Sequence, residues 1–310
     1  MTGTLRIGTR GSPLARWQAE HVAERLRTAH PGLAVELRVV KTTGDKVLDV
    51  PLAKIGGKGL FIKEIEEALA AGEVDAAVHS MKDVPASLPP GFALAAVLER
   101  ADPRDALVGL PLAALRAGVR VGTGSLRRAA QLLARVPGLA VEPLRGNVDT
   151  RLRKLDEGHY EAIVLAVAGL TRLGHAARVT EALDPDVMVP GVAQGAIGIE
   201  VRAGDEVVRA VCAPLHHAET ARAVGAERAL SRALGGSCEV PVAGYARREA
   251  DGALVLDALV ATPDGRELLR ERRRGAASDP EALGRAAAEA LLARGADRIM
   301  RALGGGGVRR

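Results

Sequence analysis

The chain has 310 residues, of which 47% are apolar and 26% are charged. A chain of this size builds more than one hydrophobic core, which excludes a miniprotein that depends on disulfide staples and indicates two or three domains. The net charge of +5 fits an anionic ligand or a nucleic acid. Aromatic residues make up only 2% of the chain, which argues against single-strand binding by base stacking.

No segment of the sequence predicts export or membrane insertion. The opening residues, MTGTLRIGTR, lack a long apolar segment behind their charges. The longest apolar runs, such as AIVLAVAGL at 162–170, are far shorter than a membrane span. We therefore expect a cytoplasmic protein, in which the two cysteines form no disulfide.

The first region alternates strand and helix signals. Ser12 and Pro13 predict a capped helix start, and apolar residues follow at helical spacing. Strands are predicted at 5–8, 35–40 and 74–78, and a second helix at 62–72. The last strand ends abruptly in HSMKD, which places an ammonium and a carboxylate, Lys82 and Asp83, side by side. The junction of a buried strand with a loop is where α/β proteins commonly bind ligands.

A second alternating region begins near Asp102, and the pattern changes after about residue 218. In the second region, strands are predicted at 119–122, 139–144 and 162–170. A glycine-rich turn and a helix are predicted within TGSLRRAAQLLAR at 123–135, and RGNVDTRLRKL at 145–155 is expected to open another helix. This alternation favours largely parallel sheets with helices on both faces. The third region indicates a small α+β domain. Its predicted elements are a helix at 218–234, antiparallel strands at 240–248, 253–261 and 267–273, and a helix at 280–303 before a mobile tail.

Four strand-to-loop junctions carry unusual polar chemistry. Helix starts favour anions through free backbone N–H groups, and arginine adds a planar fork that matches a carboxylate or phosphate. Besides HSMKD, the junctions contribute Arg10, Ser12 and Gln18; Thr123, Ser125, Arg127 and Arg128; and Arg145, Asn147 and Arg151. Together they predict one or more ligands with many negative groups. The GTGS stretch lacks the full pattern of either nucleotide-binding loop, which argues against a nucleotide.

The glycine-rich segment 41–61 leaves two interpretations open. It is long and cationic, and Lys54, Lys58 and Phe61 suit a mobile lid over an anionic site. A plain surface loop explains the same composition.

The two cysteines and Asp83 also leave alternatives. Cys212 lies in an apolar, helix-like setting and is expected to be a packed thiol. Cys238 lies on a loop in GGSCEVP, where a functional and a structural thiol are equally open. Asp83 either pairs with an arginine or serves a positive charge or a proton that appears during a reaction.

These motifs together resemble those of the porphobilinogen deaminase (hydroxymethylbilane synthase) family. The resemblance runs in order through GTRGSPLA, KTTGD, GGKGLFIKEIEEAL, AVHSMKDVP, GTGSLRR, RGNVDTRL, LAVAGLTRL, QGAIGIE, AERAL and GGSCEVPVAGY. The family condenses four porphobilinogen molecules head to tail with release of ammonia, and hydrolysis frees the linear tetrapyrrole hydroxymethylbilane. The resemblance therefore implies a transferase of tetrapyrrole (haem) biosynthesis.

The resemblance also implies a cofactor and roles for individual residues. A dipyrromethane, built from two porphobilinogen units, is expected on a thioether to Cys238, and Asp83 is the implied catalytic acid. Lys82 is expected to point away from Asp83 if the segment stays extended. The implied cofactor contacts are Ser80, Lys82, Thr123, Ser125, Arg127, Arg128, Arg145 and Gly146. The implied substrate contacts are Arg10, Ser12, Gln18, Arg151, Arg172 and Gln194, with Lys54, Lys58 and Phe61 in the lid and no metal.

The family fold implies two periplasmic-binding-protein-like α/β domains flanking a cleft, plus a small α+β domain with an antiparallel three-stranded sheet. The implied boundaries are 1–97 with 194–214, 101–190 and 218–303, with a flexible tail at 304–310. The chain departs from the family pattern at Ala193, Ser237 and Glu239, where glycine, glycine and glutamine are more usual. Glu239 is expected to affect the loop conformation or the acidity of the neighbouring thiol only slightly.

Two other classes of function compete with this interpretation. A binding or sensor protein on the same two-lobed fold explains the arginines and the lid, but not Cys238 or Asp83, and it predicts an unmodified thiol. A nucleic-acid-binding protein, suggested by charge alone, predicts strongly salt-dependent binding and a basic face. We favour the deaminase, with porphobilinogen as its small-molecule substrate, no nucleic-acid or membrane partner, and a monomeric chain.

Overall fold

A computed structural model describes residues 3–42, 62–235 and 240–303 of the chain. The chain forms two compact units, Met1–Ala101 with Gly195–Ala221, and Asp102–Gln194 with Arg222–Arg310. Across the described ranges, every helix is too short or too polar to cross a membrane.

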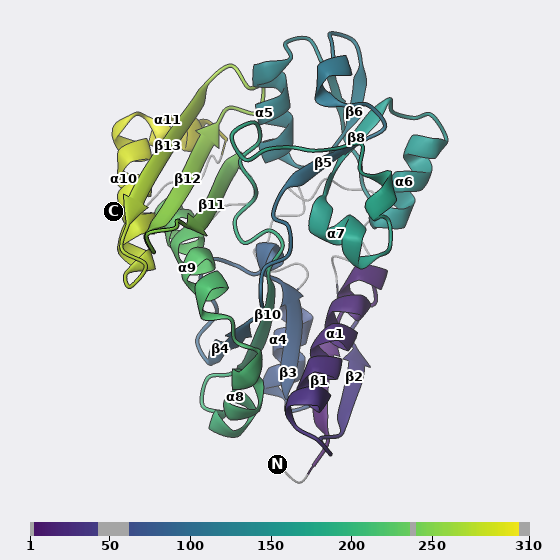
Figure 1. The fold of residues 1–310 in the computed structure, drawn as a ribbon, viewed down its shortest axis with the longest axis vertical. Coiled ribbons are helices and arrows are strands. Elements are labelled where there is room, and N and C mark those ends of the chain that lie inside the picture. The colour runs from purple at the N-terminus through teal and green to yellow at the C-terminus, as the bar shows by residue number, and fades with distance from the viewer. Residues whose placement is uncertain (1–2, 43–61, 236–239, 304–310) are drawn as a thin grey trace. The chain divides into compact units, whose positions relative to one another are not determined.

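The first unit contains a five-stranded mixed sheet in the order β2-β1-β3-β10-β4 (Figure 1). β1 pairs in parallel with β2 and β3, whereas β10 pairs antiparallel with β3 and β4. The strands are β1 (Leu5–Thr9), β2 (Val35–Val39), β3 (Ala76–Ser80), β4 (Phe92–Val97) and β10 (Ile197–Arg202). The helices are α1 (Pro13–Ala29), α4 (Lys63–Ala70), α8 (Glu206–Cys212) and the 3-10 turns η1 (Met81–Asp83) and η4 (Ala213–Leu215).

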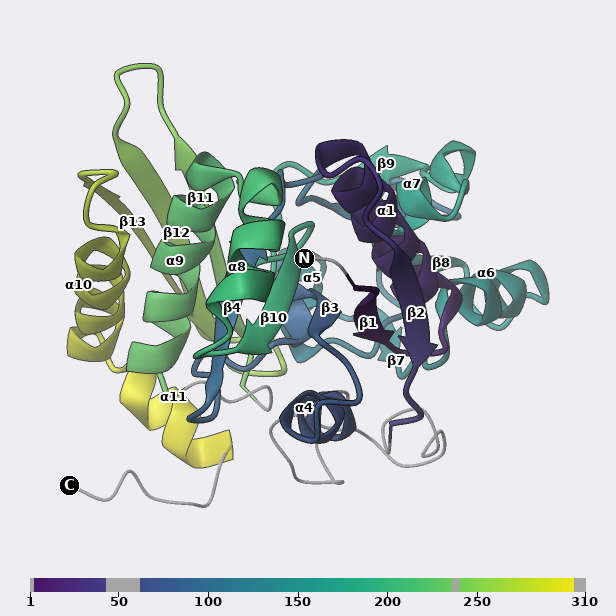
Figure 2. The ribbon, with the colours of Figure 1, turned by 90° about the horizontal axis from the view of Figure 1, so that it is seen from below.

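The two faces of this sheet are covered by different helices (Figure 2). One face packs Val78 and its neighbours against α1 and α8, and the other packs Ala77 against the apolar side of α4. Side chains alternate along a strand, so His79, two residues after Ala77, lies on the face that α4 covers. Glu200 lies on the same face, because its neighbours Ile199 and Val201 belong to the opposite cluster.

The second unit contains two sheets. A five-stranded mixed sheet has the order β7-β6-β8-β5-β9, and an antiparallel sheet has the order β11-β12-β13 (Figure 1). The strands are β5 (Asp105–Val108), β6 (Arg120–Gly122), β7 (Ala140–Glu142), β8 (Ala162–Ala166), β9 (Glu181–Ala182), β11 (Val242–Arg248), β12 (Leu254–Ala261) and β13 (Leu268–Gly275). The helices are α5 (Leu126–Arg135), α6 (Val148–Asp156), α7 (Val167–Arg172), α10 (Pro280–Ala293) and α11 (Ala296–Leu303), with 3-10 turns η2 (Leu112–Ala114) and η3 (Ala176–Arg178). Helix α9 (Ala218–Ala233) begins in the first unit and continues in the second.

Helix α9 fixes the chain just before Gln194. With α10 and α11, it packs its apolar residues on one face of the three-stranded sheet. Its fully buried Glu227 accepts hydrogen bonds from the backbone N–H of Ala193 at 2.6 Å and of Ala246 at 2.7 Å. Ala193 has a φ of 58°, in the left-handed region that favours glycine. The contact with Glu227 helps to hold Ala193 in this conformation.

The predicted fold class is confirmed in its elements: a mixed α/β chain with an additional three-stranded antiparallel sheet. The prediction of largely parallel sheets is wrong. Among the described strands, each five-stranded sheet has two parallel and two antiparallel pairings. Strand direction depends on long-range connections such as the return of β10 between β3 and β4, which local alternation does not encode. The division into three domains stays a prediction.

Three predicted elements end elsewhere in the structure. β3 includes His79 and Ser80, and the next three residues form the turn η1, so Lys82 does not continue an extended segment. The predicted strand 162–170 is strand only to Ala166 and then helix α7, because a short apolar run fits either structure. The predicted helix 280–303 is divided into α10 and α11 at Gly295, whose φ is +92°. The predicted mobile tail lies outside the described residues.

The packing of α10 on α9 predicts opposite effects for two helical glycines. A Cβ at Gly284 would stand 2.3 Å from the Ala226 carbonyl oxygen, so Gly284→Ala is expected to lower the free energy of unfolding by about 1–3 kcal/mol. A Cβ at Gly225 meets only ordinary contacts from 3.5 Å outward, so Gly225→Ala should raise it by up to about 1 kcal/mol through helix propensity. Urea unfolding of both variants measures the difference, and equal signs would contradict the packing described.

Candidate active site

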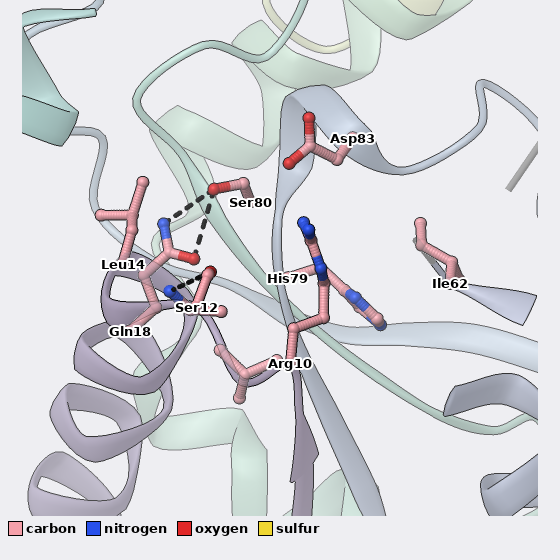
Figure 3. Close-up of a pocket in the computed structure, with 10 residues that line it drawn as sticks. Arg10, Ser12, Leu14, Gln18, Ile62, His79, Ser80 and Asp83 are labelled. Carbon is pink, nitrogen blue, oxygen red and sulfur yellow. Dashed lines mark hydrogen bonds between the residues drawn. The ribbon is translucent and has the colours of Figure 1, made fainter. Parts of the chain in front are cut away.

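A pocket in the first unit gathers residues from the start of α1 and the end of β3 (Figure 3). It is lined by Arg10, Ser12, Leu14, Ala15, Gln18, Ile62, Val78, His79, Ser80 and Asp83. Five residues predicted from two separate sequence motifs therefore line one pocket. Lys82, predicted from the same HSMKD motif as Asp83, is exposed on η1 beside it.

Local structure explains how these side chains come together. β1 and β3 are adjacent and parallel, so the segments that follow them leave the sheet at the same edge. Ser12 caps α1, with its hydroxyl oxygen accepting from the backbone N–H of Ala15 at 3.3 Å, as predicted. Gln18 is buried, and its amide nitrogen donates to the hydroxyl of Ser80 at 2.8 Å, which ties α1 to β3. Asp83 follows one turn later and is exposed.

The second unit holds a cluster around a buried carboxylate, Asp105. Arg127 donates to it from Nη1 at 2.6 Å, Arg128 from Nε at 2.9 Å, and Gln194 from Nε2 at 3.0 Å. All four side chains are buried. Three predicted site residues thus meet at a residue that was not predicted.

The cluster contains two positive charges, on Arg127 and Arg128, and one negative charge, on Asp105. Burial alone raises the pKa of Asp105, but the positive charges of Arg127 and Arg128 and their hydrogen bonds hold that pKa far below its ordinary value. Burial lowers the pKa of Arg128, which the charge of Asp105 partly offsets. Two guanidinium groups share one carboxylate, so the cluster has an excess of positive charge in a buried place. Such a place favours an additional anion.

The predicted residues around the starts of α5 and α6 form short capping structures. The hydroxyl oxygen of Ser125 accepts from the N–H of Arg128 at 3.4 Å, and that of Thr123 accepts from the N–H of Ser125 at 3.2 Å. Arg151 donates from Nε to the carbonyl oxygen of Gly146 at 2.8 Å. Glycine suits this last position, because its φ is +110°.

Two more predicted basic residues belong to this unit. Arg145 directly precedes Gly146, on the loop before α6. Arg172 ends α7, and burial lowers the pKa of its guanidinium to about 10. A positive charge that is partly withdrawn from water gains more from a negative ligand than an exposed one does.

Several predictions fall outside the described residues, namely Lys54, Lys58, Phe61 and Cys238. Cys212, in contrast, is confirmed as a packed thiol: it is fully buried in α8, and burial raises its pKa to about 12. Within the described ranges, no group of three or more histidine, cysteine or acidic residues is arranged to hold a metal ion.

The sequence analysis missed two buried acidic residues, Asp105 beside Arg127 and Arg128, and Glu200 beside His79. Asp105 opens the buried strand DALV, and Glu200 lies within the buried strand IGIEVR. A single carboxylate in an otherwise apolar strand was the available signal, because buried carboxylates almost always have a charged or hydrogen-bonding partner.

Comparison with known proteins identifies the family. The model of the porphobilinogen deaminase dipyromethane cofactor binding domain matches residues 5–210, and that of the porphobilinogen deaminase C-terminal domain matches residues 221–293. The chain belongs to the porphobilinogen deaminase family. It is 58% identical over 303 residues to a porphobilinogen deaminase of Methylobacillus flagellatus, covering 97% of each chain. It is 56% identical to that of Thiobacillus denitrificans, covering 97% of this chain and 99% of the relative.

Among solved structures, a TRAP periplasmic solute binding protein from Desulfovibrio salexigens matches with a TM-score of 0.42 at 12% identity. The match covers 70% of this chain and 73% of that one.

The described residues fit the cofactor that the family model names. A dipyrromethane assembled from porphobilinogen carries acetate and propionate groups, so its site needs cationic and N–H donors. The Asp105 cluster supplies an excess of buried positive charge, and α5 and α6 supply capped helix starts in the same unit. The chemistry of this donor set therefore suits a carboxylate-rich ligand.

The buried cluster predicts a strong dependence of stability on Asp105. Asp105→Asn leaves two buried guanidinium groups without their carboxylate and is expected to lower the free energy of unfolding by about 3–5 kcal/mol. Asp156→Asn removes a carboxylate of the exposed pair with Arg178 and should cost at most about 1 kcal/mol.

The effect of Asp105→Asn also has a defined pH dependence. Because the folded-state pKa of Asp105 is lowered, its contribution is fully present above the unfolded pKa of about 4 and is lost as pH falls below it. Urea unfolding at pH 7 and at pH 3 checks this. Equal losses for the two variants at pH 7 would contradict the role of Asp105.

Proposed function

We propose that this chain condenses four porphobilinogen molecules head to tail, releases one ammonia at each addition and yields hydroxymethylbilane by hydrolysis. The observation that carries the proposal is the pocket that combines Asp83 with Arg10, Ser12 and Ser80. The names of relatives that share more than half of their residues with this chain support the same reaction.

Asp83 is the proposed catalytic residue. Departure of ammonia takes the electron pair of the C–N bond and leaves positive charge on the pyrrole ring. A carboxylate that accepts the pyrrole N–H stabilises this charge where it develops, and a fixed carboxylate does so without reorganising at the moment of reaction. Asp83 follows directly after β3, whose position is fixed by pairing with β1 and β10.

The remaining residues are proposed to bind the carboxylate groups of the pyrroles. Arg10, Ser12, Gln18, Arg151, Arg172 and Gln194 are assigned to the substrate. Ser80, Lys82, Thr123, Ser125, Arg127, Arg128, Arg145 and Gly146 are assigned to the dipyrromethane, with Cys238 as its covalent anchor. When bound, the dipyrromethane supplies the pyrrole carbon to which the first substrate molecule is added.

The anchor also bears on where the protein works. A cysteine forms a thioether only while its sulfur is a free thiol or thiolate. We therefore propose a cytoplasmic location, where thiols stay reduced, and a monomeric chain that acts on a small molecule.

Replacing Asp83 separates its catalytic role from a structural one. Asp83→Asn keeps the shape of the side chain but removes its charge, and we expect kcat to fall by about 100-fold or more. The exposure of Asp83 predicts unchanged unfolding. Absorbance of oxidised product after incubation with porphobilinogen measures turnover, and Glu99→Gln, an exposed acid of the same unit, is the control. A turnover of Asp83→Asn near that of the control would refute the assignment.

A further inference from the structure

Three titratable residues lie behind the pocket and have no part in the reaction as described so far. His79 lines the pocket together with Asp83. Its Nε2 lies 2.9 Å from Oε2 of Glu200, and both side chains are buried, with 4% and 0% of their surface exposed. Glu66 is on α4, the helix that covers this face of the sheet.

The two carboxyl groups influence each other's ionisation. Burial, followed by the negative charge of Glu200, raises the pKa of Glu66 to about 7, although the neighbouring His79 lowers it somewhat. Two adjacent carboxylates in a buried place do not both ionise readily. In addition, Oε1 of Glu66 and Oε1 of Glu200 are both buried without a hydrogen-bond partner in the described structure. A proton on either residue would satisfy these oxygens.

Several other charged groups lie on the elements around these three residues. Towards the far end of the sheet, Asp75 binds Arg6 through both oxygens, and Arg202 binds Asp205 at 2.7 Å. On α4 itself, Lys63 is paired with the exposed Glu67 at 3.8 Å. Glu64, on the same helix, is half-buried, and its Oε2 is buried. Arg10 and Asp83 are the charged groups that line the pocket with His79. Glu200 is thus the carboxylate that contacts the imidazole directly, and Glu66 interacts with both of these residues.

We propose that the half-buried Glu66 and the buried Glu200 and His79 form a carboxyl, carboxylate and imidazole relay that takes up a proton from the pocket at His79 during the proposed condensation. The inference rests on the function proposed above. Each addition replaces a C–N bond by a C–C bond: ammonia leaves with the C–N electron pair, and the attacking ring carbon must lose a proton to recover aromaticity. With Nε2 on Glu200, the nitrogen that accepts this proton is Nδ1.

The charges of Glu66, Glu200 and His79 suit this step. In the proposed starting state, one of the two carboxyl groups is protonated, and the three residues together carry one negative charge. After His79 takes up a proton, the relay is neutral, and Glu200 stabilises the imidazolium. His79 is then the residue that exchanges the proton with the pocket, while Glu200 and Glu66 are positioning residues that act through it.

The first test follows His79 itself, in the purified protein and without turnover. The imidazole of His79, assigned by its loss in His79→Gln, is followed by NMR from pH 5 to pH 9. We expect its resonance to show an additional step near pH 7, caused by ionisation of Glu66. The step should disappear in Glu66→Gln and persist in Glu67→Gln, an exposed acid on the same helix. If the His79 resonance had the same pH dependence in the parent, Glu66→Gln and Glu67→Gln proteins, the proposed coupling of these three residues would be wrong.

The second test asks whether the relay serves the reaction. His79→Gln keeps a donor for Glu200 but cannot take up a proton, so kcat should fall by about 100-fold with little change in KM. Glu66→Gln should change the pH dependence of kcat near pH 7, whereas Glu67→Gln should not. A kcat of His79→Gln within threefold of the parent, with the NMR step present, would overturn the catalytic part of the proposal. If the parent protein itself does not turn over porphobilinogen, the proposed function fails instead. The NMR result still decides whether Glu66, Glu200 and His79 are coupled as proposed.

Discussion

The buried contact between Asp105 and two arginines is the interaction on which the proposed ligand binding by the second unit depends. A guanidinium group withdrawn from water is costly, and two of them side by side are costlier. Asp105 makes the arrangement stable while neutralising only one of the two charges. The remaining charge is held by the β5 strand and the α5 helix rather than by a flexible loop, so a negative ligand meets a group that is already in place.

In the first unit, too, hydrogen bonds fix the positions of the side chains that line the site. This unit places a carboxylate, Asp83, in the same pocket as the guanidinium of Arg10. The pocket is built on a rigid frame, in which Ser12 caps α1 and Gln18 joins α1 to Ser80. Behind it, Glu200 holds His79 from the neighbouring strand. Polar side chains that line the pocket are thus hydrogen-bonded to buried polar side chains, and these hydrogen bonds fix their orientation.

Local sequence signals predicted the parts of this structure that depend on neighbours in the chain. The cap at Ser12, the helix from Lys63 and the three-stranded sheet follow from spacing and turn residues. The sequence did not predict which strands run antiparallel, because the position of β10 between β3 and β4 is decided by a connection of about a hundred residues. It also did not predict that Arg127, Arg128 and Gln194 converge on Asp105. Nothing near Asp105 in the chain marks its partners, which lie 22 to 89 residues away.

The central claim, that this chain extends a primer held on Cys238, is tested most directly by the intact mass of the purified protein and a peptide map. The account predicts a mass that exceeds that of the polypeptide by two porphobilinogen units less two ammonias, with the increment on the peptide that contains Cys238. Protein isolated without its primer should gain the same increment on that peptide when porphobilinogen is added. A mass that equals that of the polypeptide and stays unchanged after this addition would contradict the account and favour a binding protein on the same fold.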